Sequence, residues 1–296
     1  MEDFLCRFAD QFPDLAADIL YRDRHKRRNF REETITDVLM AGLTAFEPLG
    51  IRVDFPVDES KTGEDMDWEF VDPQAPDRRS YLRLHIQAKR AIISDSKKDP
   101  YWFYRELDHG VPQGALKGSQ HKLLVDNAVA SQGCVPLYMF YHPRDALAER
   151  TGKLPAIAGV NVMFADRIPW QLSPGHWPVA DKKVEKWRPH FLALSSLLCP
   201  GHDATGVPRA QRKRLTYFVF RGYPIVFDRP FFVSPGELAD RLNGLWAENE
   251  DPDPRKFRAI SDIPESTRRA LSAGLGAEHT ADIERPRVIF RTLRVR

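Results

Sequence analysis

The spacing of apolar residues near the N-terminus predicts two helices. The first covers residues 4–21, and the second covers 31–47. In the second, Ile35, Leu39 and Phe46 belong to a stripe of apolar positions that recur three and four residues apart, which places them on one face of a helix. We therefore expect this stripe to face the hydrophobic core.

The pattern changes to alternation after the second helix, and alternation indicates strands. We expect strands at 51–55, 63–71 and 81–89. The stretch 72–80 contains two prolines and reads as a turn, so the last two strands are predicted to form an antiparallel hairpin. One face of its second strand is polar and carries Arg83, His85, Gln87 and Lys89.

The register of this hairpin decides which polar residues meet. With a symmetric connection, Asp67 lies opposite Gln87, and Asp65 lies opposite Lys89. This register is a hypothesis, because a bulge or a one-residue slip would break it. Alternation in either case places Gln87 and Lys89 on the same face of their strand.

Beyond the hairpin, the pattern predicts a helix at 119–131 and an apolar, aromatic strand at 135–141. The resulting order is helix, strand, strand, strand, helix, strand. This order predicts an α/β fold with a central mixed sheet flanked by helices.

The second half of the chain has a weaker pattern, which is expected to give an α+β arrangement. The predicted elements are a strand within 155–164, a helix at 184–198, and a strand pair at 215–220 and 224–227. A further helix is expected to begin after Ser234, because Ser-Pro-Gly-Glu supplies an N-cap, a proline at the first position and a capping box.

Composition is that of an ordinary globular protein, with 42% hydrophobic and 29% charged residues. We expect a core domain at 1–150 and an extension of unknown role at 151–296, although a single domain fits the same pattern. Apolar runs fall short of the roughly 20 residues that cross a bilayer. The acidic N-terminus and the scattered cysteines argue against secretion, so we expect a cytoplasmic protein without a membrane partner.

Charge is nearly balanced, since 44 basic and 42 acidic residues leave a formal net charge of +2. Basic residues nevertheless cluster at 22–31 and 209–214, and such clusters suit contacts with phosphates. Each cluster taken alone is more typical of a solvated surface. The aromatic run 101–104 suits base stacking, and packing against the core is an equally good interpretation.

The predicted hairpin carries groups that phosphodiester hydrolysis requires. The reaction needs an activated water and stabilisation of negative charge on the phosphate, and Mg²⁺ held by oxygen ligands supplies both. A nearby lysine can orient the water and neutralise the developing charge. Aspartates on one strand, with Gln87 two residues before Lys89 on the other, match this requirement.

These strings resemble the PD-(D/E)xK nuclease superfamily, which has a restriction-endonuclease-like, three-layer α/β core. The residues that carry the resemblance are Gly63-Glu64-Asp65-Met66-Asp67-Trp68 and Ile86-Gln87-Ala88-Lys89-Arg90. The string QAKR is similar to the QxK variant of Mrr-type restriction enzymes. The resemblance covers about residues 31–141.

The resemblance implies roles for individual hairpin residues. Either Asp65 or Asp67 would be the metal-binding aspartate; Asp65 fits the motif better, and Asp67 fits the symmetric register. Gln87 would replace the usual acidic ligand, and Lys89 would be the catalytic lysine.

The resemblance also implies an acidic residue on the helix before the first strand. Glu32 lies on the sheet-facing stripe of the predicted helix, whereas Glu33 points about a quarter-turn away, so Glu32 is preferred and both are retained. Gln120 and Arg90 are candidate substrate contacts. For Gln120 alone, an exposed polar role is the simpler interpretation.

The function implied by this resemblance is a Mg²⁺-dependent DNA endonuclease, with Mn²⁺ as a substitute, acting in restriction or antiviral defence. RNA is an alternative substrate. The second half would recognise DNA, a partner protein or an activating ligand, and a homodimer is compatible with this picture. The alternative is an inactive nuclease-fold module that binds nucleic acid or a partner protein. Gln87 favours that alternative, because a neutral amide binds Mg²⁺ less strongly than a carboxylate does.

Overall fold

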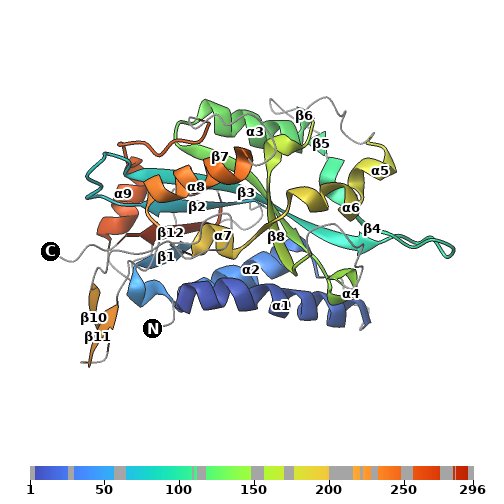
Figure 1. Cartoon of the computed structure of the whole chain (residues 1–296), viewed down its shortest axis with the longest axis horizontal. Helices are drawn as coiled ribbons and strands as arrows, with labels where there is room; N and C mark the ends of the chain where they lie inside the picture. Colours follow the sequence, from blue (N-terminus) through green and yellow to red (C-terminus); the bar gives the residue numbers. More distant parts are fainter. Residues whose placement is uncertain are drawn as a thin grey trace.

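The computed structural model places a central mixed sheet between helices (Figure 1). The eight-stranded sheet has the order β1-β12-β2-β3-β7-β8-β9, and β4 pairs with β3 outside this path. The predicted α/β class with a mixed, helix-flanked sheet is therefore confirmed. The structure describes residues 4–25, 30–56, 65–108, 110–111, 118–147, 157–169, 177–199, 216–220, 223–227, 233–247, 256–273, 283 and 285–292.

The strands of the first half confirm the alternation pattern. They are β1 (Ile51–Asp54), β2 (Asp65–Val71), β3 (Tyr81–Ile93) and β7 (Cys134–Tyr141). β3 is antiparallel to β2 and parallel to β7, so it lies inside the sheet. It continues beyond the expected end at Lys89, and β4 (Trp102–Tyr104) folds back against its last residues.

The helices of the first half also lie where apolar spacing predicts them. They are α1 (Phe4–His25), α2 (Glu32–Thr44) and α3 (Gln120–Ala130). The short helix η1 (Glu47–Leu49) follows α2, and Gly50 then turns the chain into β1 with a left-handed φ of 101°. Glycine suits this position because it has no Cβ to clash with the backbone.

The predicted hairpin is present, but its predicted register was wrong. Asp65 pairs with Gln87, and Asp67 pairs with His85, a shift of two residues. The reason lies in the turn, where the amide of Asp72 donates to the carbonyl of Ser80 at 2.9 Å and extends the pairing into the connection. A shift of two preserves alternation, so Gln87 and Lys89 keep their shared face.

Strands from both sides of residue 150 belong to the central sheet. β8 (Val160–Phe164) pairs with β7, and β9 (Leu192–Ala193) pairs with β8. Near the end of the chain, β12 (Arg287–Arg291) lies between β1 and β2, antiparallel to the first and parallel to the second. The last strand in the sequence thus completes the part of the sheet that contains β2.

Two further sequence predictions in the second half are confirmed. The hairpin of β10 (Thr216–Phe220) and β11 (Tyr223–Phe227) is present. α8 (Pro235–Ala247) begins at the predicted capping box, where the amide of Glu237 donates to Ser234 Oγ at 3.3 Å and the amide of Ser234 donates to Glu237 Oε2 at 3.1 Å. The short helix α9 (Glu265–Ser272) lies between α8 and β12 in the sequence.

The continuous helix predicted at 184–198 was wrong. The segment forms α6 (Val184–Trp187), η5 (Arg188–His190), β9 and α7 (Ser195–Leu198). Pro189 contributes to the break, because proline lacks the amide hydrogen that would donate to the preceding helical turn. Other short elements are η3 (Arg105–Asp108), β5 (Gly110–Val111), β6 (Gly118–Ser119), α4 (Arg144–Leu147), η4 (Ala165–Arg167) and α5 (Val179–Lys182).

Two apolar clusters pack against opposite faces of β3. Leu82, Leu84 and Ile86 pack in the larger cluster, to which α1, α2, α7 and α8 contribute. Ala91 packs in a second cluster with residues of α3 and α6. Alternation along β3 places Gln87 and Lys89 on the face of Ala91. Within the described ranges, each helix is too short or too polar to span a bilayer.

Candidate functional site

Gln87 and Lys89 lie in the middle of the sheet rather than at its edge. Each side chain is 1% exposed. The ammonium group of Lys89 donates a hydrogen bond to Oε1 of Gln120, with 3.2 Å between the heavy atoms. Gln120 is the first residue of α3, so this bond ties the start of that helix to β3.

Glu32 reaches β3 one residue beyond Lys89. It is the first residue of α2, and its Oε1 accepts a hydrogen bond from the backbone amide of Arg90 at 3.3 Å. Glu33 follows it in the first helical turn. Its Oε2 is buried and accepts no hydrogen bond from the described part of the chain. The first turn of α2 therefore brings carboxylate groups to the strand that carries Lys89.

Asp65 is the first residue of β2 and pairs with Gln87 in the ladder. Its side chain lies outside the described residues, as do His109 and the basic cluster 209–214. The backbone alone thus brings Asp65 next to Gln87, whereas the predicted register placed it opposite Lys89.

Asp67 lies in a different environment. Its Oδ1 accepts a hydrogen bond from Nδ1 of His85 at 2.7 Å, and its Oδ2 lies 3.8 Å from a guanidinium nitrogen of Arg83. Burial raises the pKa of Asp67, but the bond from His85 and the nearby charges of His85, Arg83 and Arg285 together lower it below the usual 3.8. Asp67 is therefore an ionised carboxylate held by protein cations.

Asp67 belongs to a wider set that we call the charge network. Asp54 accepts from Nη2 of Arg287 at 2.7 Å, and both side chains are nearly buried. Glu69 accepts from the hydroxyl of Thr267 at 2.8 Å, and burial raises its pKa despite the opposing effects of Arg287 and Thr267. The network comprises Arg52, Asp54, Asp67, Glu69, Arg83, His85, Thr267 and Arg287.

The side chain of Arg90, a predicted substrate contact, is held by the protein. Its Nη1 donates to the carbonyl of Phe30 and lies 3.5 Å from Oδ2 of Asp23. Phe30 lies two residues before α2, so Arg90 links β3 to the entry of that helix. This placement fixes the strand beside Lys89.

The buried histidines outside the hairpin have core positions. Nε2 of His121 lies 3.0 Å from the carbonyl oxygen of Ile168, and burial lowers the pKa of His121. Nε2 of His142 lies 2.6 Å from the hydroxyl of Tyr104, and burial lowers the pKa of His142 to about 3. Both rings are therefore neutral. They form hydrogen bonds beside the second apolar cluster.

Oxygen-bearing side chains lie along this stretch of β3. Among the described residues, no group of three or more His, Cys, Asp or Glu is placed to hold a metal ion. The oxygen donors are the carboxylate of Glu32 and the amide of Gln87, and Asp65 pairs with Gln87. Carboxylate and amide oxygens are the hard ligands that Mg²⁺ and Mn²⁺ prefer, so the donor types fit such an ion.

Sequence reasoning missed the pairing of Asp67 with His85. Both residues lie on polar faces of the predicted strands, but the sequence does not fix the register across the turn 72–80. It also missed a pocket formed by arginines from three segments, which is described below. Such a pocket leaves no local pattern, since α1, β3 and η3 meet only in the folded chain.

Comparison with known proteins identifies the family of this chain. A model for a family of unknown function, DUF6615, matches residues 5–292. Neither the curated proteins nor the solved structures contain a match. Since the matched range runs from α1 to β12 and covers nearly the whole chain, the chain belongs to the DUF6615 family.

Proposed function

We propose that this protein is a metal-dependent nuclease that hydrolyses phosphodiester bonds in DNA. Its active site would lie along Gln87–Lys89 of β3, the start of β2 and the first turn of α2. The observation that carries the proposal is Lys89, whose side chain is 1% exposed and whose ammonium group is bonded to Gln120. Burying a lysine is costly, so its placement in contact with Gln120 and on the same strand face as Gln87 favours a chemical role.

The proposed roles follow from these positions. Glu32, Gln87 and Asp65 would hold one Mg²⁺ or Mn²⁺ ion. The ion, when bound, supplies Lewis-acid stabilisation of negative charge on the phosphate. Lys89 would orient the attacking water and stabilise the charge that develops on phosphate oxygens. Gln120 would hold the ammonium group of Lys89 in place, because their hydrogen bond fixes one donor direction.

Asp65 is favoured over Asp67 as the metal-binding aspartate. The ladder pairs Asp65 with Gln87, whereas Asp67 is paired with His85. A carboxylate that accepts from His85 and Arg83 would have to break those contacts in order to bind a metal. Of the two aspartates that the sequence leaves open, the proposal therefore assigns the metal to Asp65.

The proposal is tested by cleavage of duplex DNA, single-stranded DNA and RNA with Mg²⁺ or Mn²⁺. Lys89→Met keeps a similar length without the charge, and we expect it to reduce the cleavage rate by about 10²–10³-fold. Lys122→Met is the matched control, since Lys122 is an exposed residue of α3 that pairs with Asp126. Circular dichroism should show that both variants remain folded.

The outcomes separate the proposal from its rivals. Cleavage by the parent that is lost in Lys89→Met and kept in Lys122→Met supports the nuclease. Cleavage of RNA alone would assign a ribonuclease. A parent that cleaves none of the three substrates with either metal would overturn autonomous nuclease activity.

An inactive nuclease-fold module that binds nucleic acid or a partner protein is the second candidate. It is favoured by Gln87 and by the lack of three clustered acidic, histidine or cysteine ligands among the described residues. Calorimetry with Mn²⁺ distinguishes the two. A single site that is lost in Asp65→Asn and Glu32→Gln supports the nuclease, whereas heat signals that these substitutions leave unchanged support the module.

A further inference from the structure

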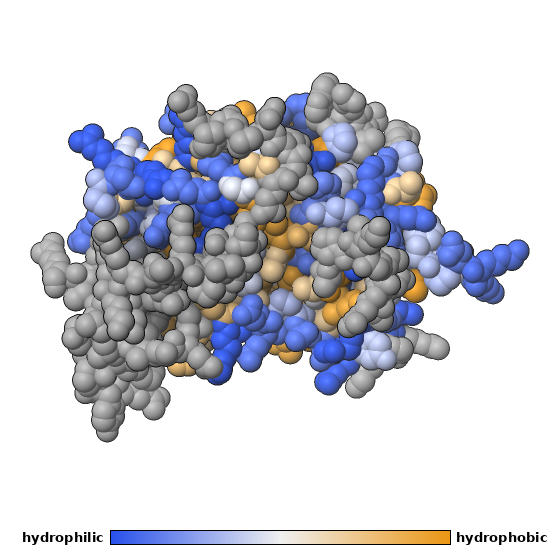
Figure 2. All heavy atoms as spheres, viewed as in Figure 1, coloured by the Kyte–Doolittle hydropathy of each residue, from blue (hydrophilic) through white to orange (hydrophobic). Residues whose placement is uncertain are grey.

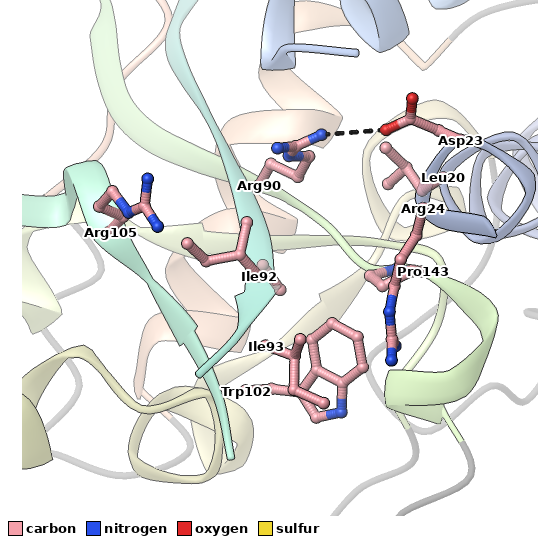
Figure 3. Close-up of a pocket in the computed structure, with 10 residues that line it drawn as sticks. Leu20, Asp23, Arg24, Arg90, Ile92, Ile93, Trp102, Arg105 and Pro143 are labelled. Atoms are coloured by element: carbon pink, nitrogen blue, oxygen red, sulfur yellow. Dashed lines mark hydrogen bonds and ion pairs between the residues drawn. The ribbon is translucent and has the colours of Figure 1, made fainter. Parts of the chain in front are cut away.

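A pocket of about 270 Å³ lies beside the last residues of β3, next to Arg90 (Figure 3). Four segments form it: the end of α1, the end of β3, the β4–η3 segment and the loop that follows β7. Its volume is near the lower end of the range for small-molecule sites. The lining residues are Leu20, Asp23, Arg24, Arg90, Ala91, Ile92, Ile93, Trp102, Arg105 and Pro143.

The lining of this pocket is positively charged. Arg24, Arg90 and Arg105 face a single acidic residue, Asp23, and Arg90 lies within ion-pair distance of that residue. Arg24 pairs with Asp145, which lies outside the lining. Arg105 is exposed and makes no hydrogen bond or ion pair with the residues that the structure describes. An arginine with this freedom can place its planar fork against a phosphate.

Figure 3 shows how the arginines are arranged around an apolar wall. Arg90 and Arg105 lie on either side of Ile92, and Arg24 extends along Trp102. The guanidinium carbon of Arg24 lies 5.5 Å from the centroid of the Trp102 ring. Trp102 is itself 4% exposed, so the outer face of Arg24 is the accessible part of this stack. Nucleobases stack on arginine planes as well as on aromatic rings.

We propose that this pocket binds a nucleoside phosphate. Arg105 would bind the phosphate, and the base would stack on the platform that Arg24 and Trp102 form, against the apolar wall of Ile92 and Ile93. Of the aromatic run 101–104, which the sequence left open between stacking and packing, Trp102 is packed in the core and supports Arg24 from below. The ligand can be one unit of a nucleic-acid strand or a free nucleotide.

The surroundings of the pocket suit a negatively charged ligand. The β3–β4 hairpin projects from the body of the molecule (Figure 1), and its tip is hydrophilic in Figure 2. The charged residues of this tip, Asp95, Lys97, Lys98 and Asp99, are all exposed and their formal charges cancel. Arg22 and Arg31, from the basic cluster at 22–31, are exposed at the end of α1 and the entry of α2. A strand that reaches the pocket along these two helices would meet positive charge there.

The inference is tested by binding measurements in EDTA, where no metal-dependent cleavage occurs. The probe is a short, fluorescently labelled single-stranded oligodeoxynucleotide, and AMP and inorganic phosphate are competitors. We expect Arg105→Gln, which loses a charge-assisted phosphate contact, and Arg24→Gln, which loses the stacking surface, each to weaken binding about tenfold. Arg268→Gln is the matched control, because Arg268 is an exposed arginine of α9 paired with Glu265.

Each outcome decides a part of the inference. Competition by AMP that exceeds competition by phosphate supports a pocket open to free nucleotides, and oligonucleotide binding that AMP does not displace supports a strand. Binding that Arg105→Gln and Arg24→Gln leave intact overturns the site, as does an equal loss in Arg268→Gln. If inorganic phosphate competes as well as AMP does, the proposed stacking of the base on Arg24 is wrong. Because no cleavage is measured, failure of the proposed nuclease leaves this test intact.

Discussion

The two ends of the β2–β3 pair carry similar residue types in different surroundings. Toward the turn, in the charge network, Asp67 and Glu69 each have a protein partner, His85 and Thr267 respectively. Toward the start of β2, Glu32 accepts one backbone hydrogen bond, and one oxygen of Glu33 accepts none from the described residues. At the first end, protein groups donate to the carboxylates. At the second end, the carboxylates keep oxygen atoms that can accept further contacts.

This difference separates structural carboxylates from candidate ligands. An ionised carboxylate offers about four lone-pair positions, and a cation from the protein that occupies them competes with a metal ion. Asp67 is buried and ionised because His85 and Arg83 hold it. Acidic alternation in a strand is thus a weak guide to metal binding until the partners of each carboxylate are known.

The largest expected effect tests the charge network at the pair of Asp54 and Arg287. These side chains are 5% and 6% exposed and lie 2.7 Å apart. We expect Asp54→Ala to lower the free energy of unfolding by about 3–5 kcal/mol, because the buried guanidinium of Arg287 loses its counter-charge. Urea denaturation measures this change.

Asp77→Ala provides the control for that prediction. Asp77 pairs with Arg79 at the same distance of 2.7 Å, but both side chains are exposed. Its removal should cost less than about 1 kcal/mol, since water screens the pair. Equal effects for Asp54→Ala and Asp77→Ala would mean that burial does not distinguish the network from a surface pair.

A smaller effect is expected where a hydroxyl rather than a cation satisfies a carboxyl group. Thr267→Val removes the hydrogen bond to Glu69, which is 5% exposed, and should lower the free energy of unfolding by about 1–3 kcal/mol. Urea denaturation again provides the measurement. Thr44→Val, at an exposed helix end, should have a smaller effect; the reverse order would contradict the assignment of Thr267 to the network.

Much of the fold was predictable because local patterns determine it. Alternation in β2 and β3, and the apolar stripe of α2, indicate the type of each element and its apolar face, and the structure confirms these elements. The position of β12 between β1 and β2 was not predictable, since pairing between distant strands leaves no local spacing. Pro189 could have indicated the break in the helix predicted at 184–198, but the apolar spacing of this segment favoured a continuous helix.

The candidate site was predictable in its residue types and less so in its pairings. Gln87 and Lys89 share a face because alternation requires it, and the contact of Lys89 with Gln120 joins two residues that the sequence had placed separately. The partner of Asp67 depended on the register of a turn, and a change of two residues exchanged Gln87 for His85. Positions set by alternation were therefore secure, whereas positions set by a turn required the structure.

The smallest expected effect concerns the pH dependence that Asp67 gives to stability. Its folded pKa lies below the usual 3.8, so the unfolded state binds more protons in this range and stability rises with pH. The contribution is present above about 3.8 and is lost as the pH falls through the folded pKa. Asp67→Asn should remove this contribution and lower the free energy of unfolding near neutral pH by about 1 kcal/mol, because the amide can still accept from His85.

Urea denaturation of the parent and Asp67→Asn measures the free energy of unfolding between acidic and neutral pH. The difference between the two proteins separates the contribution of Asp67 from that of Glu69. Glu69 acts in the opposite direction, because burial raises its pKa and its ionised form costs stability as the pH rises. The difference between the two proteins should therefore shrink toward acidic pH, while the slope due to Glu69 persists in both. A difference that stays constant with pH would show that His85 and Arg83 do not hold Asp67 as a carboxylate, and Asp67 would return as a candidate ligand beside Asp65.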